Sequence, residues 1–105
     1  MTRVELRVHN AGACAETVRG KLPFAILEKG AVVVRSQLGP EVPLNDHLVW
    51  LWGMLQHERR ILKSATSAGA RIVCECVVPR GPITLMPNGA EMLHLLGVEL
   101  LLQPG

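Results

Sequence analysis

The stretch Leu44–Ala68 constrains the fold of this chain more than any other segment, because it alone is long and periodic enough to predict an extended helix. At about 100° per residue, the main apolar stripe consists of Leu48, Leu51, Trp52, Leu55 and Leu62. A second stripe beside it consists of Trp50, Met54 and Ile61. Together they exceed the ~100° apolar arc of an ordinary surface helix. We therefore expect the sheet and a second element to cover this helix.

The same stretch carries signals for the two ends of the helix. Asn45 is a residue type preferred at the N-cap, where its side chain accepts a bond from the first turn. Gly69 suits the left-handed backbone position that commonly closes a helix. The sequence therefore predicts one helix over nearly the whole range.

Length and composition indicate a single domain over residues 1–105. A chain of 105 residues is near the common size for one core. Its hydrophobic content of 49% is enough to fill that core, which argues against disorder. Aromatic residues make up only 3%, so packing must depend on Leu, Val, Ile and Met.

The charge pattern argues against a nucleic-acid partner or an anionic membrane surface. The net charge is +2, and no run of like charge exceeds two residues, which is typical of a solvated surface. A sheet that binds RNA stacks bases on aromatic side chains, and the predicted strands contain none. Cross-strand pairing with Glu5 and Glu75 is the simpler role for the strand arginines Arg3, Arg7 and Arg71.

Cysteine usage and hydropathy favour the cytoplasm. Three cysteines, an odd number in a small chain, argue against a disulfide framework. No apolar run reaches the ~18 residues of a membrane span. The residues after Met1 alternate between charged and apolar, unlike those of a signal peptide.

The first part of the chain predicts a strand, a short helix and a hairpin. Residues 2–9 alternate between apolar and charged side chains, as in a half-buried strand. Cys14, Val18 and Leu22 then stand four apart, as on one face of a helix that Pro23 stops. Lys29-Gly30 is a turn signal before the β-branched run 31–34, which indicates a hairpin or a bent pair of strands.

The last part of the chain predicts three strands and a helix. Residues 71–78 form a strand, and residues 83–86 return the chain as a second strand after a Pro-Arg-Gly-Pro turn. Pro87 fits the first position of a helix over 88–96 that Gly97 closes, and residues 98–103 form the final strand. The resulting order, β-α-β-β-α-β-β-α-β, predicts an α+β fold. We expect a mostly antiparallel sheet with helices on one face, a ferredoxin-like or related sandwich.

Several of these features occur together in one known pattern. They are the Leu22-Pro23 step followed by Lys29-Gly30, the helix HLVWLWGMLQHERRIL, a strand led by Gly69, a Leu-x-Pro start to the last helix, and the ending Leu95-Leu96-Gly97-Val98-Glu99-Leu100. Over most of its length the chain resembles a bacterial family known only as a domain of unknown function. The resemblance implies such a helix, two strands, a helix end of this leucine-glycine type and a closing strand. It assigns no catalytic role to any residue.

Cys74 and Cys76 are the pair most suggestive of a metal site. Alternation places both sulfurs on one strand face, where Cys14 and a histidine could in principle complete a zinc site. Their spacing lacks the turn of a CxxC knuckle, and Ile72 and Val78 share their face. We therefore interpret them as core thiols. Because no metal-ligand spacing, phosphate-binding loop or nucleophile motif is present, we predict no metal, no cofactor and no catalytic residue.

Glu58 is the least expected charge in the long helix. On a helical wheel it lies within the apolar arc, with His47 close to the same face. A buried carboxylate must be paired, hydrogen-bonded or protonated. One interpretation is a solvent-reachable seam between two apolar faces. The other is a ligand pocket containing Glu58 and His47.

The second stripe predicts an interface. Trp and Met are enriched at protein–protein contacts, and the candidate residues are Trp50, Met54, His57 and Ile61. We expect a non-catalytic cytosolic domain that forms a homodimer or binds a partner protein, through this stripe or the Val-bearing outer sheet face. An immunity-type or antitoxin-type inhibitor is one form of this hypothesis. The alternative is a small-molecule binder or minor enzyme that uses the pocket around Glu58 and His47.

Overall fold

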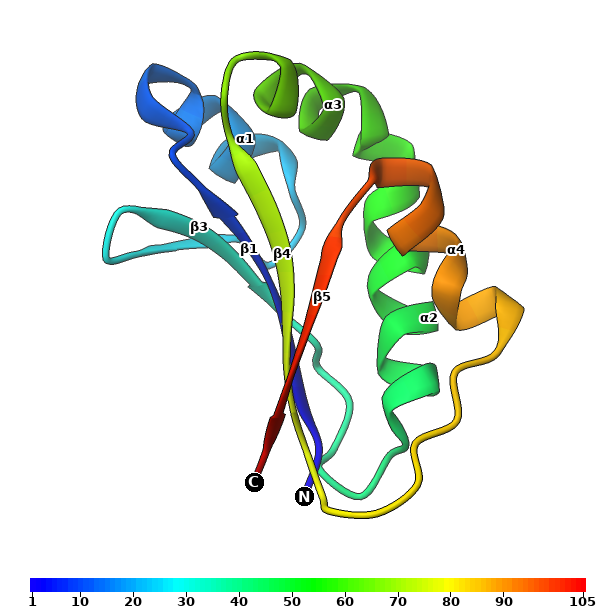
Figure 1. Ribbon diagram of the computed structural model, residues 1–105. Coiled ribbons are helices and arrows are strands. Elements are labelled where there is room, and N and C mark those ends of the chain that lie inside the picture. The colour runs from blue at the N-terminus through cyan, green and yellow to red at the C-terminus, as the bar shows by residue number, and fades with distance from the viewer.

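The computed structural model describes all residues, 1–105, as one sheet with every helix on the same side of it (Figure 1). The strands, in chain order, are β1 (Arg3–His9), β2 (Ile26–Glu28), β3 (Ala31–Arg35), β4 (Arg71–Val78) and β5 (Glu99–Pro104). The helices are α1 (Ala15–Lys21), α2 (Leu44–Leu55), α3 (Arg59–Ser67) and α4 (Pro87–Leu96), with single 3₁₀ turns at Gly12–Cys14 and Gln56–Glu58.

The sheet has the order β2-β3-β1-β4-β5. The pairs β1–β3, β1–β4 and β2–β3 are antiparallel, so β1 and β2 run parallel with β3 between them. This split β-α-β arrangement is the ferredoxin-like one. The chain then returns through α4, and β5 joins the sheet parallel to β4. The predicted α+β class, the mostly antiparallel sheet and the placement of the helices are confirmed.

A single core lies between the helices and the inner sheet face. The predicted alternation of β1 is confirmed, because Val4, Leu6 and Val8 are buried while the residues between them are not. All five residues of the main apolar stripe are buried as well. One connected cluster of 23 buried residues includes both sets, so these elements share one core.

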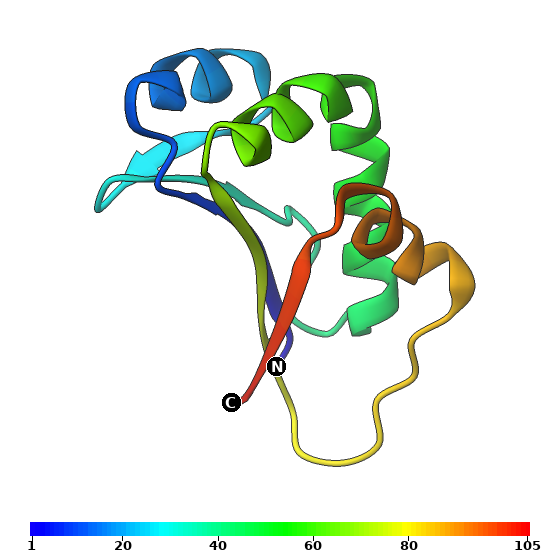
Figure 2. The ribbon, with the colours of Figure 1, turned by 45° about the horizontal axis from the view of Figure 1, so that its top comes forward.

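The prediction of one helix over 44–68 is wrong at its middle. The helical backbone is interrupted at Gln56–Glu58, where Glu58 has φ −110° and ψ 18°. Beyond this break α3 turns across the end of the sheet (Figure 2). A straight helix of that length would extend about 37 Å, whereas the eight residues of β4 span about 27 Å. The break therefore lets Leu62 and Ala65 reach the core instead of passing beyond it.

The predicted strand at residues 83–86 is also wrong. Residues 79–86 form an exposed connection between β4 and α4. The place beside β4 is taken by β5, so this segment has no strand to pair with. Its prolines, Pro79 and Pro82, also remove backbone donors that a sheet would need.

Asn45 lies inside α2, and Pro43 occupies the N-cap position predicted for it. The Asn45 side chain instead accepts a bond from the Met86 backbone N–H at 2.8 Å and donates to Asn88 Oδ1 at 3.0 Å. A Cβ added at Gly89 would collide with Asn45 Oδ1. Asn45 therefore joins α2 to the start of α4, and Gly89 allows the two helices to approach.

The hairpin at Lys29-Gly30 is confirmed, since Glu28 pairs with Ala31 across a two-residue turn. Both turn residues have positive φ, 51° for Lys29 and 81° for Gly30. This is the requirement of a type I′ turn, whose twist matches that of the flanking strands.

We predict that Lys29→Asn stabilises the protein, by up to about 1 kcal/mol, because asparagine tolerates the left-handed conformation better than lysine. Urea denaturation of the wild type and the variant measures the difference. Lys29→Val is the opposite control and should lower the free energy of unfolding, since β-branched residues are disfavoured at positive φ. Equal stability of all three proteins would contradict this account of the turn.

Candidate interaction surface

Phe24 has an unusual backbone and an unusual exposure. It follows Pro23 in the turn that leads from α1 to β2, and its φ is 59°, a left-handed value that is rare for a bulky residue. Its side chain is 59% exposed. The ring lies against Trp50 of α2, with centroids 5.9 Å apart and planes tilted by 37°. This strained turn therefore holds an aromatic ring at the surface.

Trp50 is half-buried, and Met54 lies one helical turn further along the exposed flank of α2. We call Phe24, Trp50 and Met54 the aromatic patch. Two of its members were predicted from the second stripe. Phe24 was missed, because its contact with Trp50 depends on the turn after α1. The only sequence signal for it was the scarcity of aromatic residues.

The other two candidate interface residues lie elsewhere. His57 lies in the break after α2 and lines a polar cavity of about 410 Å³ with residues of α4, including Glu91 and Leu95. Ile61 lines an apolar groove of about 230 Å³ between α3 and the start of α1, with Cys14 and Val18. His57 and Ile61 therefore line two different cavities, and the interruption at 56–58 separates both from the regular helix that carries Trp50 and Met54.

The ligand pocket predicted around His47 and Glu58 is absent. The two residues are eleven positions apart, with His47 in the first turn of α2 and Glu58 at the end of the helical break, and neither lines any of the four cavities. Glu58 is half-buried and makes no side-chain hydrogen bond or ion pair. The solvent-reachable seam is the interpretation that fits.

His47 is buried, and it organises the connection between β3 and α2. Its Nδ1 lies 2.7 Å from Ser36 Oγ, which also accepts a bond from the Leu38 N–H. The direction of the Ser36–His47 bond follows the ring tautomer: the hydroxyl donates when the ring proton is on Nε2 and accepts when it is on Nδ1. Nε2 has no partner within hydrogen-bond geometry, although the Val42 and Gly39 carbonyls lie near the ring. Burial lowers the pKa of His47, and those carbonyls partly oppose it.

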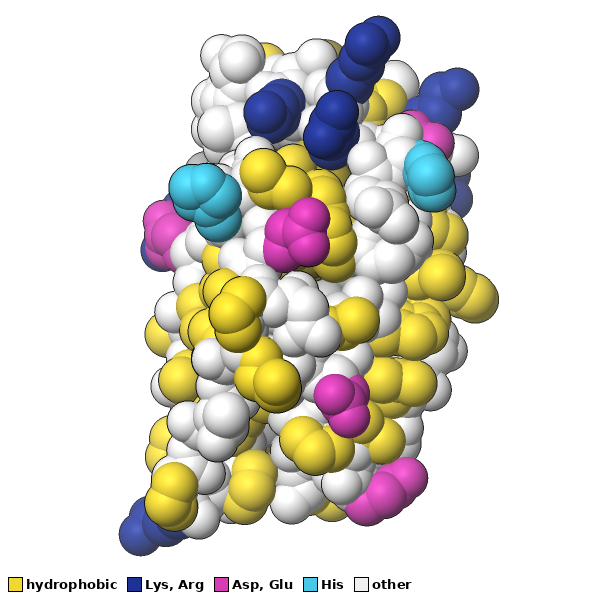
Figure 3. All heavy atoms as spheres, turned by 90° about the vertical axis from the view of Figure 1, so that its right-hand side faces the viewer, with side chains coloured by type: hydrophobic (Ala, Val, Ile, Leu, Met, Phe, Trp, Pro, Cys, Tyr) yellow, Lys and Arg dark blue, Asp and Glu magenta, His cyan; other side chains and the backbone are white.

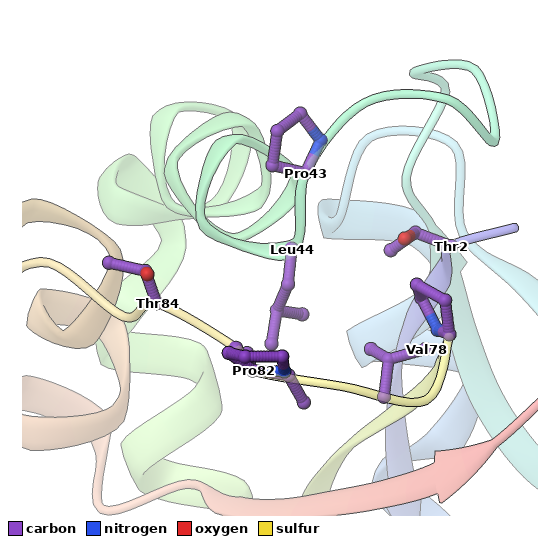
Figure 4. A pocket seen from close by; sticks show the side chains of 8 residues that line it. Thr2, Pro43, Leu44, Val78, Pro82 and Thr84 are labelled. Atoms are coloured by element: carbon purple, nitrogen blue, oxygen red, sulfur yellow. The ribbon is translucent and has the colours of Figure 1, made fainter.

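A further cavity lies at the end of the sheet where β1 begins and β4 ends. This cavity has a volume of about 400 Å³, and Figure 4 shows Leu44 pointing into it between Pro82 and Val78. The volume is within the range of ligand sites. Its lining contains two threonines and no charged or titratable side chain, so it offers no acid, base or ion clamp: Thr2, Pro43, Leu44, Val78, Pro79, Pro82, Ile83 and Thr84.

The centre of the outer sheet face is covered by ion pairs, whereas the outward-facing Ile26 and Leu101 on its two edge strands are exposed. Arg7 bonds to Glu5 at 2.5 Å and to Glu28 at 3.0 Å, and it lies 3.4 Å from Glu75. Arg35 also pairs with Glu28, and the two arginine bonds lower the pKa of Glu28. The predicted cross-strand pairing is therefore confirmed for Arg7 with Glu75, whereas Glu5 is its neighbour on the same strand and pairs across strands with Arg35. Arg71 pairs with Glu99 instead.

Two valines of the outer face, Val33 and Val73, are opposite Arg7 in the two neighbouring strands, and both are buried. The side chains of the ion-paired residues cover them. The centre of the outer face, where these valines lie, is therefore not the apolar association surface that the sequence suggested. On the helical side, apolar side chains are interspersed with single carboxylates, and basic side chains gather at the end formed by α3 (Figure 3).

The cysteines of β4 are core residues, as interpreted from the sequence. Cys74 and Cys76 are fully buried, with their Sγ atoms 3.9 Å apart. The bond to Cys76 and burial raise the pKa of Cys74, so it stays a thiol. Cys14 is half-buried at the α1–α3 groove, apart from that pair. No group of three or more His, Cys, Asp or Glu residues is placed to hold a metal ion.

No family model, curated protein or solved structure matches the chain. The resemblance to a family of unknown function stays a prediction. None of the helices combines the length and apolar character needed to cross a membrane.

We predict that His47 makes the fold less stable in mild acid. Its pKa is lowered in the folded state from an ordinary value near 6.5, so below that pH the unfolded chain takes up a proton that the folded chain resists. The free energy of unfolding should therefore fall between about pH 6.5 and 5, with a slope of at most about 1.4 kcal/mol per pH unit. Urea denaturation at several pH values measures it. His47→Gln should flatten this part of the curve, and an unchanged slope would contradict the assignment.

We predict that the three thiols differ in reactivity. In the native protein only Cys14 should react rapidly with Ellman's reagent, because the other two are buried. All three should react after denaturation. Rapid release of more than one equivalent from the native protein would show that β4 is accessible and that the core is packed differently.

Proposed function

We propose that this protein acts by binding a partner protein through the aromatic patch, without catalysing a reaction itself. The observation that carries the proposal is Phe24. The chain has three aromatic residues, and two of them meet on one surface, where the most exposed is held on left-handed backbone. Aromatic residues and Met are the residue types enriched in the centres of protein–protein interfaces.

The energetics of Phe24 support this interpretation. Left-handed backbone at a bulky residue costs about 1–3 kcal/mol. An aromatic pair contributes about 0.5–1.5 kcal/mol beyond the area that it buries, and more than half of the Phe24 side chain remains in water. The isolated fold therefore gains little from this arrangement. A partner that buries the ring would provide the missing stabilisation.

The three unpaired cysteines favour the reducing cytoplasm as the place of this binding. An inhibitor of the immunity or antitoxin type is one form that such a protein could take, by analogy with other small domains that occlude a partner. Ligand binding is the less favoured function, since neither Glu58 nor His47 lines a cavity and the cavity beside Leu44 contains no charged group.

Site-specific photocrosslinking in cells that naturally express the protein tests the proposal. We expect Phe24→p-benzoylphenylalanine to give one discrete adduct with another protein, and Ile83→p-benzoylphenylalanine to give none. Met54→Lys should abolish the adduct, because it places a charge within the patch. Val49→Lys is the matched control, since Val49 lies on the same helix and both side chains are 36% exposed.

Equal adducts from positions 24 and 83, or an adduct that survives Met54→Lys, would overturn the proposal. An adduct of twice the chain mass would instead assign the patch to self-association. A stability measurement separates binding from folding. Phe24→Gly relieves the backbone strain, so its free energy of unfolding should lie within about 1 kcal/mol of the wild type. A loss above about 2 kcal/mol would show that the ring serves to cover the core.

A further inference from the structure

The two edges of the sheet differ in length and in chemistry. The β2 edge has three residues, and Glu28 within it is held by Arg7 and Arg35. The β5 edge has six residues, with three consecutive leucines at its centre. No strand or helix covers the free side of β5 (Figure 1). Natural proteins usually protect such an edge, because its unpaired backbone groups attract another strand.

The backbone hydrogen bonds show which groups of β5 remain free. The Gly105 N–H donates to the Val78 carbonyl at 2.9 Å, and Val78 is the register partner of Pro104. Odd-numbered residues of β5 therefore direct their backbone groups toward β4, and even-numbered residues direct theirs toward the free edge. Leu100 and Leu102 present both N–H and C=O outward. Pro104 presents only its carbonyl.

We propose that two copies of the chain pair through their β5 strands, antiparallel and about a two-fold axis at Leu101. In this register Leu100 of each copy is opposite Leu102 of the other. Each such pair exchanges both of its N–H···O bonds, so every outward N–H of the central edge is satisfied. The resulting dimer has one continuous sheet with all helices on the same side.

In this register the side chains of one β5 strand are compatible with those opposite them in the second copy. Leu101 lies on the outer face and meets its own copy at the closer, non-hydrogen-bonded position. Glu99 is held by Arg71 at 2.6 Å and would be opposite the uncharged Gln103 of the second copy. No like charges are opposed along the seam, and the two leucine pairs lie on the inner face.

The same geometry limits assembly to two chains. The pairing uses the only long edge that each copy has, and the missing N–H of Pro104 ends the ladder at both sides. Two three-residue β2 edges remain at the outer ends of the joined sheet. The contact is therefore isologous and closed, and it does not propagate into a fibre.

This seam lies at the opposite sheet edge from the turn that carries Phe24, so it goes beyond the proposed partner binding and does not depend on it. Sedimentation equilibrium of the purified full chain over a range of concentrations tests it. We expect the wild type to show a concentration-dependent monomer–dimer equilibrium. Leu101→Lys and Leu101→Glu should each weaken dimerisation at least about tenfold, since like charges would meet at the axis. An equimolar mixture of the two variants should restore the dimer.

Ile26→Lys is the matched control, because Ile26 lies on the other edge strand and both side chains are 43% exposed. It should leave the dimerisation constant unchanged. A wild type that stays monomeric up to about 1 mM would overturn the proposal, as would equal weakening by Ile26→Lys or a mixture that fails to recover. Circular dichroism of each variant shows that its monomer is folded. The Phe24 adduct should persist in Leu101→Lys, so failure of one proposal does not imply failure of the other.

Discussion

The contact between α2 and the inner face of the sheet is the interaction on which the rest of the structure depends. Leu48, Leu51 and Leu55 are fully buried there, at about 1.5–3 kcal/mol for each leucine taken out of water. Because the apolar arc of α2 is wider than the sheet can cover, its two flanks need other partners. The α4 flank is joined through Asn45 and Trp52, and the opposite flank carries the aromatic patch.

The sequence predicts those helices and strands that bury one face, because burial of one face gives their apolar residues a regular spacing. The strands β1 and β4, the short helix before Pro23 and the helix closed by Gly97 are of this kind. The interruption at 56–58 could not be predicted, because it depends on the length of the sheet. The spacing of apolar residues within the helix carries no information about that length. The failed strand at 83–86 has a similar cause, since β5 takes its place beside β4 only after the chain has passed through α4.

The candidate site was predictable to the same limited extent. Trp50 and Met54 were found because both lie on one unbroken helix. Phe24 joins them across 26 positions of chain, through a backbone conformation that propensity does not favour. His47 and Glu58 were placed on one face by a helical-wheel projection, which assumes a continuous straight helix. The helix is interrupted at 56–58, so the projection does not hold for this pair. The sequence thus predicted which side chains share a face of one regular helix, but it did not predict contacts between different elements.

Gly89 has a consequence that extends beyond the two helices that meet there. The Asn45 side chain facing it is already bonded to Met86 and Asn88, so it cannot yield to a larger residue. A substitution at Gly89 would move α4 outward, and β5 would follow because it begins directly after that helix. Helix spacing and the position of the edge strand are therefore mechanically coupled, so a substitution at Gly89 would displace the β5 edge without changing any of its residues.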